Sequence, residues 1–222
     1  MNKNTFWVKH NRVFVKDENK NVVEIPAQYL FDIWQNPKDG NKPEEYKKGA
    51  NRSEKLVSLF DKFCSKEDSI LELGCNIGRN LDHLYRAGYE NLSGLDINNS
   101  ALKMGRQLYP DTVGKIPLIW SPIEEQIMRI PNNSIDVMFT MGVLMHLHPS
   151  STWVFNYIKH IIRKYLIIAE EEGGVCEYVF PRNYKTLFEN LKLKQIYEEY
   201  VEYPNDVDNL GKIKVTYRVF KK

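Results

Sequence analysis

The stretch ILELGCNIG, residues 70–78, carries the residue types best suited to binding a ligand. An apolar run typical of a buried strand leads into Gly74, and Gly78 precedes a segment with a helical pattern. Glycines at such a turn let the backbone approach a ligand closely, as in the dinucleotide fingerprint. Asn76 stands where that fingerprint has its middle glycine, and Glu72 lies inside the strand. A carboxylate there disfavours a pyrophosphate and favours a ligand with an ammonium group.

A second acidic residue strengthens this interpretation. Asp96 ends the next apolar run, in the region about 20 residues after the loop where a carboxylate accepts ribose hydroxyls. The glycine loop and Asp96 together predict a site for an adenosine that carries an amino-acid tail. Glu72 also has a second interpretation, in which it only holds the loop in place.

Two candidates for proton transfer follow later apolar runs. His146 comes six residues after the run that ends at Thr140, and a neutral imidazole is a suitable general base near pH 7. The alternative is that His146 holds its loop by hydrogen bonds. His148 adds a His-x-His pair, but no further ligand has matching spacing, so we predict no metal site. Glu170 begins three consecutive glutamates that orient a polar acceptor or, alternatively, face only water.

The elements that position these residues alternate between strand and helix from residue 51 onward. Residues 98–109 and 183–191 read as helices, and Pro149 opens another that runs to Arg163. Ser53 is the expected cap of the first helix. The predicted strands are 70–73, 92–97, 116–120, 135–140 and 165–169, followed by 194–202 and 212–220 without a helix between them. This order predicts a parallel α/β sheet that ends in an antiparallel hairpin.

Residues 1–50 form a separate N-terminal extension, and residues 51–222 form the main domain. The alternating runs 12–16 and 22–25 predict a hairpin. Residues 29–34 form a short amphipathic piece, and residues 36–43 are a loop rich in Pro, Gly and Asn.

Composition sets further bounds. The 222 residues include 42% hydrophobic and 27% charged residues, which is typical of a soluble protein, and the net charge of +2 is too small to indicate a nucleic-acid partner. Cys64, Cys75 and Cys176 form no CxxC pair, so neither a disulfide framework nor a zinc site is predicted. Without a signal-peptide core or an apolar run of roughly 18 residues, we expect a cytoplasmic protein with no membrane partner. The oligomeric state stays open.

The segments ILELGCNIG, GLDIN and PNNSIDVMFTMGVLMHLHP resemble the class I S-adenosylmethionine-dependent methyltransferases over residues 52–222. The resemblance implies a Rossmann-like, doubly wound and mostly parallel seven-stranded sheet, with S-adenosylmethionine as cofactor. Asn76 departs from the G-x-G-x-G pattern of that family, which leaves its contact with the methionine part in doubt.

The resemblance also implies roles for individual residues. Asp96 binds the ribose, Ile97 lies against the adenine, and Arg52 pairs with the methionine carboxylate. Trp34 and Tyr46 belong to an extension that covers the cofactor and builds the acceptor pocket. The remaining cofactor contacts come from the glycine loop, from the segment after the third strand and from the end of the fourth strand, namely Glu72, Gly74, Asn76, Gly78, Ser121, Ile123, Thr140 and Met141.

The segments GCNIG, VLMHLHP and KYLIIAEEE resemble methylases found alongside the biosynthesis of pseudaminic acid and other nonulosonic sugars. This resemblance implies methyl transfer to a small polar metabolite, such as a sugar or a nucleotide-sugar derivative, with His146 and Glu170 as catalytic candidates. Residues 140–143 lack the Asn/Asp-Pro-Pro-Tyr pattern of nucleobase amino methylation, so no nucleic-acid partner is expected. Two alternatives remain: an NAD(P)-dependent oxidoreductase or epimerase, and a non-catalytic binding module. The methylated atom, whether oxygen, nitrogen or carbon, is not determined.

Overall fold

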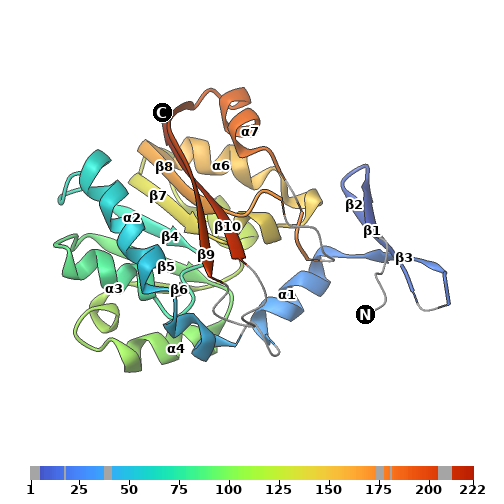
Figure 1. Ribbon diagram of the computed structural model, residues 1–222, viewed down its shortest axis with the longest axis horizontal. Helices are drawn as coiled ribbons and strands as arrows, with labels where there is room; N and C mark the ends of the chain where they lie inside the picture. Colours follow the sequence, from blue (N-terminus) through green and yellow to red (C-terminus); the bar gives the residue numbers. More distant parts are fainter. Residues whose placement is uncertain (1–5, 18, 38–41, 174–177, 181, 205–211) are drawn as a thin grey trace.

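The computed structural model describes residues 6–17, 19–37, 42–173, 178–180, 182–204 and 212–222. Its centre is a seven-stranded sheet in the order β6-β5-β4-β7-β8-β10-β9 (Figure 1). The strands are β4 (Ile70–Leu73), β5 (Leu92–Asp96), β6 (Leu118–Trp120), β7 (Ile135–Met141), β8 (Ile162–Glu170), β9 (Lys194–Pro204) and β10 (Lys212–Lys221). The first five are parallel, and β10 is antiparallel to both β8 and β9. The predicted Rossmann-like sheet with its C-terminal hairpin is confirmed.

Helices cover both faces of this sheet. The α-helices are α2 (Ala50–Phe63), α3 (Arg79–Arg86), α4 (Asn99–Leu108), α5 (Ile123–Gln126), α6 (Val154–Ile161) and α7 (Tyr184–Asn190). Alternation along β4 separates two cores: Ile70 packs with α2, α3 and α4, whereas Leu71 and Leu73 pack with α5, α6 and α7. Glu72 therefore points toward the α2 and α3 side. Short 3-10 turns fill the connections, namely η1 (Pro43–Lys47), η2 (Val113–Lys115), η3 (Ile127–Arg129), η4 (Leu144–His146) and η5 (Pro149–Ser151).

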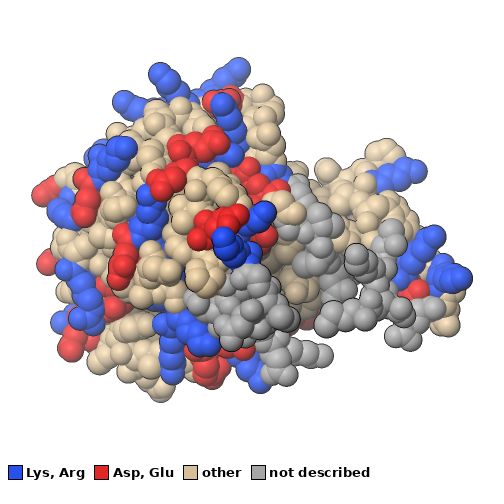
Figure 2. Space-filling view, viewed as in Figure 1, with Lys and Arg blue, Asp and Glu red and all other residues tan. Residues whose placement is uncertain are grey.

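The N-terminal residues form a small sheet that projects from the main body (Figure 1; Figure 2). Its strands β1 (Phe6–Lys9), β2 (Arg12–Lys16) and β3 (Val22–Ile25) are antiparallel, and α1 (Ala27–Gln35) follows. The β2–β3 hairpin is the one that the sequence predicts, but β1 was missed. The β1–β2 turn is His10-Asn11, with φ of 49° and 60°. Such values fit a two-residue hairpin turn, and Asn adopts them more readily than most residues. Residues 38–41 of the predicted loop lie outside the described residues.

An apolar cluster attaches this N-terminal part to the main domain. Val13, Ile25 and Leu30 are buried together with Phe180, which lies between β8 and α7 in the sequence. The backbone N–H of Phe180 in turn donates to the carbonyl of Met145 in η4. The small sheet, the Phe180 segment and the loop after β7 are therefore joined in one layer.

Two predicted helix features are wrong. Ser53 does not cap α2, because the helix begins at Ala50, after Gly49 with φ of 85°. Ser53 is instead buried inside the helix. The helix predicted to reach Arg163 ends at Ile161, and β8 begins at Ile162, which pairs with Ile135 of β7. A short apolar run fits a buried helix or a buried strand equally well, and here the pairing with β7 decides.

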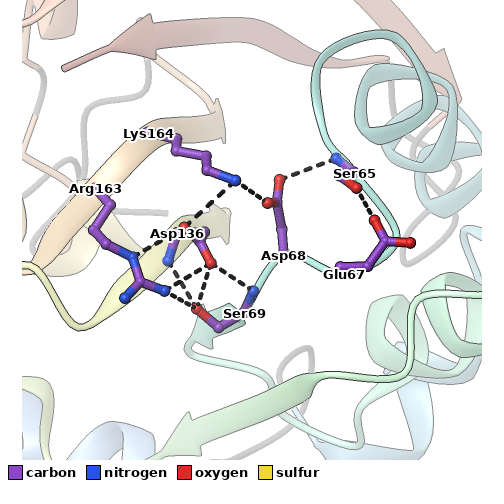
Figure 3. A network of polar contacts seen from close by, with 7 residues as sticks. All are labelled: Ser65, Glu67, Asp68, Ser69, Asp136, Arg163 and Lys164. Carbon is purple, nitrogen blue, oxygen red and sulfur yellow. Dashed lines mark hydrogen bonds and ion pairs between the residues drawn. The ribbon is translucent and has the colours of Figure 1, made fainter.

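A polar network ties the amino ends of β4, β7 and β8 together (Figure 3). The Asp136 carboxylate accepts hydrogen bonds from Arg163 Nε at 2.9 Å and from the Ser69 backbone N–H at 3.0 Å. Lys164 forms an ion pair with the buried Asp68. These contacts hold the pKa of Asp136 well below its usual range, with the Arg163 hydrogen bond as the main cause.

Replacing Asp136 with asparagine is expected to lower the free energy of unfolding by about 1–3 kcal/mol at pH 7, because hydrogen bonds to a charged group are lost. A carboxyl whose pKa is lower in the folded state stabilises above its unfolded pKa, ~3.9, and loses this contribution as pH falls through the folded value. The difference between the two proteins should therefore shrink in acid. Urea denaturation across pH checks this. Glu202→Gln, which breaks an exposed pair with Lys212, is the control and should change little.

Three absences are confined to the described residues. No described helix is long and apolar enough to cross a membrane. In the same part of the chain, no group of three or more His, Cys, Asp or Glu side chains is arranged to hold a metal ion. Cys64 and Cys75 are free thiols, and Cys176 lies outside the described residues.

Candidate active site

The loop after β4 has the tight backbone that its glycines suggest. Gly74 and Asn76 have φ of 70° and 49°. A Cβ atom on Gly74 would lie 2.4 Å from the side chain of Val143, so this position has no room for a larger residue. Asn76 takes the left-handed conformation that the missing glycine would have taken, which Asn tolerates better than most residues. Its Oδ1 accepts from the Ile77 N–H at 2.8 Å and stabilises the turn.

Asp96 ends β5 directly beside this loop. One carboxylate oxygen accepts from the Asn76 N–H and the other from the Asn98 N–H, each at 2.7 Å. Asp96 is 7% exposed, and burial raises its pKa to about 6. Since each carboxylate oxygen has about two acceptor positions, one on each stays available to a ligand. The two carboxylate oxygens of Asp96 can therefore accept hydrogen bonds from two neighbouring hydroxyl groups.

Glu72 lies behind the loop and is 1% exposed. Its Oε1 accepts from Asn80 Nδ2 at 2.7 Å, whereas Oε2 is buried with no hydrogen-bond partner among the described residues. Burial raises the pKa of Glu72 to about 8. Asn80 is oriented by Ser53, whose hydroxyl donates to Asn80 Oδ1 at 2.7 Å. The unpaired oxygen marks a place for a proton or a ligand donor.

Two arginines lie near the same loop. Arg79, the first residue of α3, donates to Ser53 Oγ at 2.9 Å and to the Tyr46 carbonyl at 3.0 Å. Arg52 packs its guanidinium over Gly49. Neither arginine forms an ion pair with a carboxylate in the described part of the chain. Both oppose the rise in the pKa of Tyr46, which burial takes to about 12. The sequence pattern did not single out Arg79 as a site residue, although Arg79 directly follows Gly78 at the end of the glycine loop.

A cavity open to solvent lies over the carboxyl ends of β4, β5 and β7. The main domain supplies one part of the wall: Gly74, Asn76, Asp96, Ile97, Asn98, Pro122, Ile123, Glu124, Met141, Gly142, Val143, His146, Leu147 and His148. The N-terminal part supplies the rest: Leu30, Phe31, Trp34, Pro37 and Tyr46.

The predicted site residues divide between the cavity wall and the layer behind it. On the wall are Gly74, Asn76, Asp96, Ile97, Ile123, Met141 and His146. The others do not line the cavity: Arg52, Glu72, Gly78, Ser121, Thr140 and Glu170. Gly78 has φ of 75° and Ser121 donates its N–H to the Asp96 carbonyl at 3.1 Å, so both support the wall from behind.

His146 is held in one orientation. Its Nδ1 lies 2.8 Å from the Tyr178 carbonyl, which can only accept, so Nδ1 carries the proton and Nε2 carries a lone pair. The ring packs against Trp34, with 4.4 Å between ring centroids. Burial lowers the pKa of His146 to about 4, so the imidazole is neutral at pH 7. No described residue hydrogen-bonds to Nε2.

The sequence suggested that Glu170 either orients a polar acceptor or faces water, but in the structure it lies inside the protein. It is fully buried, and its carboxylate accepts from the Thr140 hydroxyl at 2.6 Å and from the backbone N–H groups of Val143, Leu144 and Met145 at 3.1–3.3 Å. A carboxylate so occupied anchors the loop after β7, and Glu170 is not among the residues that line the cavity.

Trp34 and His148 complete the wall in ways that only the structure shows. Trp34 Nε1 is buried with no hydrogen-bond partner among the described residues. His148 lies 3.2 Å from the Ile25 carbonyl through Nε2, and its Nδ1 accepts from the Ser150 N–H at 3.1 Å. His148 therefore fastens the N-terminal sheet to the loop after β7. Phe31 also lines the cavity.

Comparison with known proteins identifies the domain. Residues 70–164 match the model of a methyltransferase domain family. A magnesium protoporphyrin IX methyltransferase from Synechocystis PCC 6803, solved with bound S-adenosylmethionine, has a TM-score of 0.65 at 10% identity over 88% of this chain and 96% of that one. An S-adenosylmethionine-dependent methyltransferase from Archaeoglobus fulgidus has a TM-score of 0.62 at 16% identity over 81% and 97%. No curated protein matches.

At such low identities the solved structures show only a shared fold, whereas the domain match indicates methyl transfer. The domain match supports methyl transfer rather than the oxidoreductase and the non-catalytic module. The nonulosonic-sugar branch is not among the families matched. The chain is an enzyme that carries a methyltransferase domain over residues 70–164, and its fold is that of the S-adenosylmethionine-dependent methyltransferases.

Proposed function

We propose that the enzyme transfers the methyl group of S-adenosylmethionine to a hydroxyl group of a small polar metabolite, with a sugar as the favoured class. The observation that carries this proposal is His146, whose Nε2 lone pair is free beside the cavity while Nδ1 is fixed by a carbonyl. A hydroxyl group needs such a base, because its proton must leave as the new carbon–oxygen bond forms.

The cavity also limits the kind of acceptor. Among the described residues that line it, none is Lys or Arg. A nucleotide-linked acceptor would bring a pyrophosphate without a cation to pair with it, so we favour an acceptor without phosphate. The rings of Phe31, Trp34 and His146 offer apolar faces, and Trp34 Nε1 offers a hydrogen-bond donor. A ring-shaped molecule with several hydroxyl groups meets both features, in agreement with the sugar methylases that the sequence resembles.

The residues behind and around the loop fit the parts of the cofactor. We assign Asp96 to the ribose hydroxyls, Ile97 and Ile123 to the adenine, and Arg52 together with Arg79 to the methionine carboxylate. The unpaired Oε2 of Glu72 suits the methionine ammonium. We assign the loop from Gly74 to Gly78 to the methionine backbone, Ser121 to the adenine edge, and Met141 to the sulfonium. Thr140 contributes indirectly, because its hydroxyl donates to Glu170, which anchors the loop after β7.

In this mechanism the protein mainly positions the acceptor in line with the methyl group and excludes water, since methyl transfer is an in-line displacement. The cofactor supplies an electrophilic methyl group on a sulfonium. His146 accepts the acceptor proton at Nε2 while the Tyr178 carbonyl stabilises the Nδ1–H. A pKa near 4 suffices for this task, because the hydroxyl becomes strongly acidic as it bonds to carbon.

Formation of S-adenosylhomocysteine from S-adenosylmethionine tests the proposal against a panel of free sugars, sugar acids, nucleotide-linked sugars and amines. We expect turnover with unphosphorylated hydroxyl compounds, and a product methylated on oxygen. Turnover only with amines, or only with nucleotide-linked sugars, would contradict it.

Replacing Asp96 with asparagine is expected to weaken S-adenosylhomocysteine binding by roughly 10–100-fold, because hydrogen bonds to a charged acceptor contribute ~1.5–3 kcal/mol. Calorimetric titration measures this affinity. Thermal unfolding of the variant shows whether the loops around Asn76 and Asn98 stay folded. Asp61→Asn is the control, since Asp61 pairs with Lys66 at the surface. An unchanged affinity in Asp96→Asn would show that the ribose assignment is wrong.

Replacing Trp34 with phenylalanine removes the Nε1 donor and keeps a ring against His146. We expect the KM for the acceptor to rise about tenfold, the size of one lost hydrogen bond, with unchanged affinity for S-adenosylhomocysteine. Trp7→Phe is the matched control, because Trp7 stacks on Phe14 and does not line the cavity. A loss of cofactor affinity instead would place Trp34 against the cofactor.

A further inference from the structure

Glu72 is a buried carboxyl group with half of its hydrogen bonding unmet. It points from β4 toward α2 and α3, where the Asn80 amide donates to Oε1 at 2.7 Å. Oε2 is buried without a partner among the described residues. An ionised carboxylate in such a place is costly unless it is paired, and a protonated carboxyl group is not.

The charged and titratable groups around Glu72 do not supply that pairing. Asp96 on β5 adds a like charge, and the Cys75 thiol beside it is neutral because burial raises its pKa. Arg79 on α3 favours the ionised form from a distance, but its donors go to Ser53, to backbone carbonyls and toward the sulfur of Met141. Burial outweighs these influences and raises the pKa of Glu72 to about 8.

We propose that Glu72 carries a proton in the free enzyme and releases it to solvent when the α-ammonium of the cofactor binds there. The O–H bond of the carboxyl group breaks, the proton passes to water or buffer, and an ammonium N–H donates to the carboxylate in its place. A neutral carboxyl and a cationic ligand thus become an ion pair and a free proton. The inference rests on the proposed placement of the cofactor's methionine part.

The exchange has a measurable consequence. Below the pKa values of Glu72 and of an α-amino group, ~8, each unit rise in pH is expected to tighten cofactor binding by about tenfold, the limit for release of one proton. Asp96 contributes little at pH 7, where it is mostly ionised, since its pKa is about 6.

The test is calorimetric titration of the enzyme with S-adenosylhomocysteine at pH 7.0 in phosphate and in Tris, two buffers with different enthalpies of protonation. We expect the heats to differ by the amount for nearly one released proton. 5′-Methylthioadenosine, which has the adenosine and sulfur but no amino-acid part, is expected to release none. The Glu72→Gln variant should also release none, and Glu189→Gln, an exposed glutamate of α7, should behave as the wild type.

Equal heats in both buffers, or equal proton release in Glu72→Gln, would overturn the inference while leaving the cofactor assignment intact. Failure of S-adenosylhomocysteine to bind at any pH would instead overturn the cofactor site, and the inference with it. A second measurement stands if Glu72→Gln folds poorly: wild-type affinity between pH 6.0 and 7.5 must rise with pH, and a flat profile counts against the exchange.

Discussion

His146→Gln is expected to reduce turnover by roughly 10²–10⁴-fold, the usual contribution of a general base, while the affinity for S-adenosylhomocysteine stays close to that of the wild type. Glutamine fills a similar space beside Trp34, but it has no nitrogen lone pair to accept a proton. Single-turnover kinetics with a saturating acceptor measure the loss, and calorimetry measures the affinity.

The matched control is His160→Gln. His160 lies on α6, away from the cavity, and its Nδ1 also bonds to a backbone carbonyl, that of Asn156, at 2.7 Å. It should leave turnover unchanged. If His146→Gln keeps its turnover but unfolds more easily, His146 only holds the loop, as the alternative interpretation from the sequence has it.

The pH profile gives a second check on His146. Its pKa is lowered to about 4 by burial, so the base form is already complete at pH 6 and above. The step that depends on His146 should therefore be independent of pH between 6 and 8 and should fall only as pH approaches 4. Single-turnover rates with cofactor and acceptor saturating isolate this step from cofactor binding. A rate that falls below pH 7 would contradict a buried, neutral imidazole.

Glu170→Ala is expected to lower the free energy of unfolding by roughly 4 kcal/mol or more, because four donors lose their acceptor and each such loss costs about 1–3 kcal/mol. The donors are the Thr140 hydroxyl and the backbone N–H groups of Val143, Leu144 and Met145. Urea denaturation of the wild type and the variant measures the difference.

Glu171→Ala is the control, because the next glutamate makes no such contacts to this loop and should cost little. The loop also carries His146, so Glu170→Ala is expected to lose turnover in proportion to its loss of loop order. Similar stability losses in the two variants would mean that Glu170 does not anchor the loop. A Glu170→Ala variant that is stable but inactive would indicate that Glu170 takes part directly in the reaction.

The order of strands and helices along the chain and the tight glycine loop could be predicted from the sequence alone. The strands in the middle of the sheet are apolar runs, and β9 and β10 alternate between polar and apolar residues; both are local patterns that indicate strands. The loop is equally local, since Gly74, Asn76 and Gly78 adopt positive φ values that few other residues accept. Asp96 could be placed because the end of one parallel strand lies beside the end of the next.

The contacts of the polar side chains, in contrast, could not be predicted from the sequence. Glu170 looked like part of an exposed acidic loop, but β8 carries it inward, where the loop after β7 supplies three backbone donors and Thr140 of β7 supplies a fourth. Ile162 looked helical until its pairing with β7 made it the start of a strand. The cavity wall brings together α1 and the loop after β7, which are distant in the sequence. Such contacts depend on packing between distant segments, and a local pattern of residues does not record them.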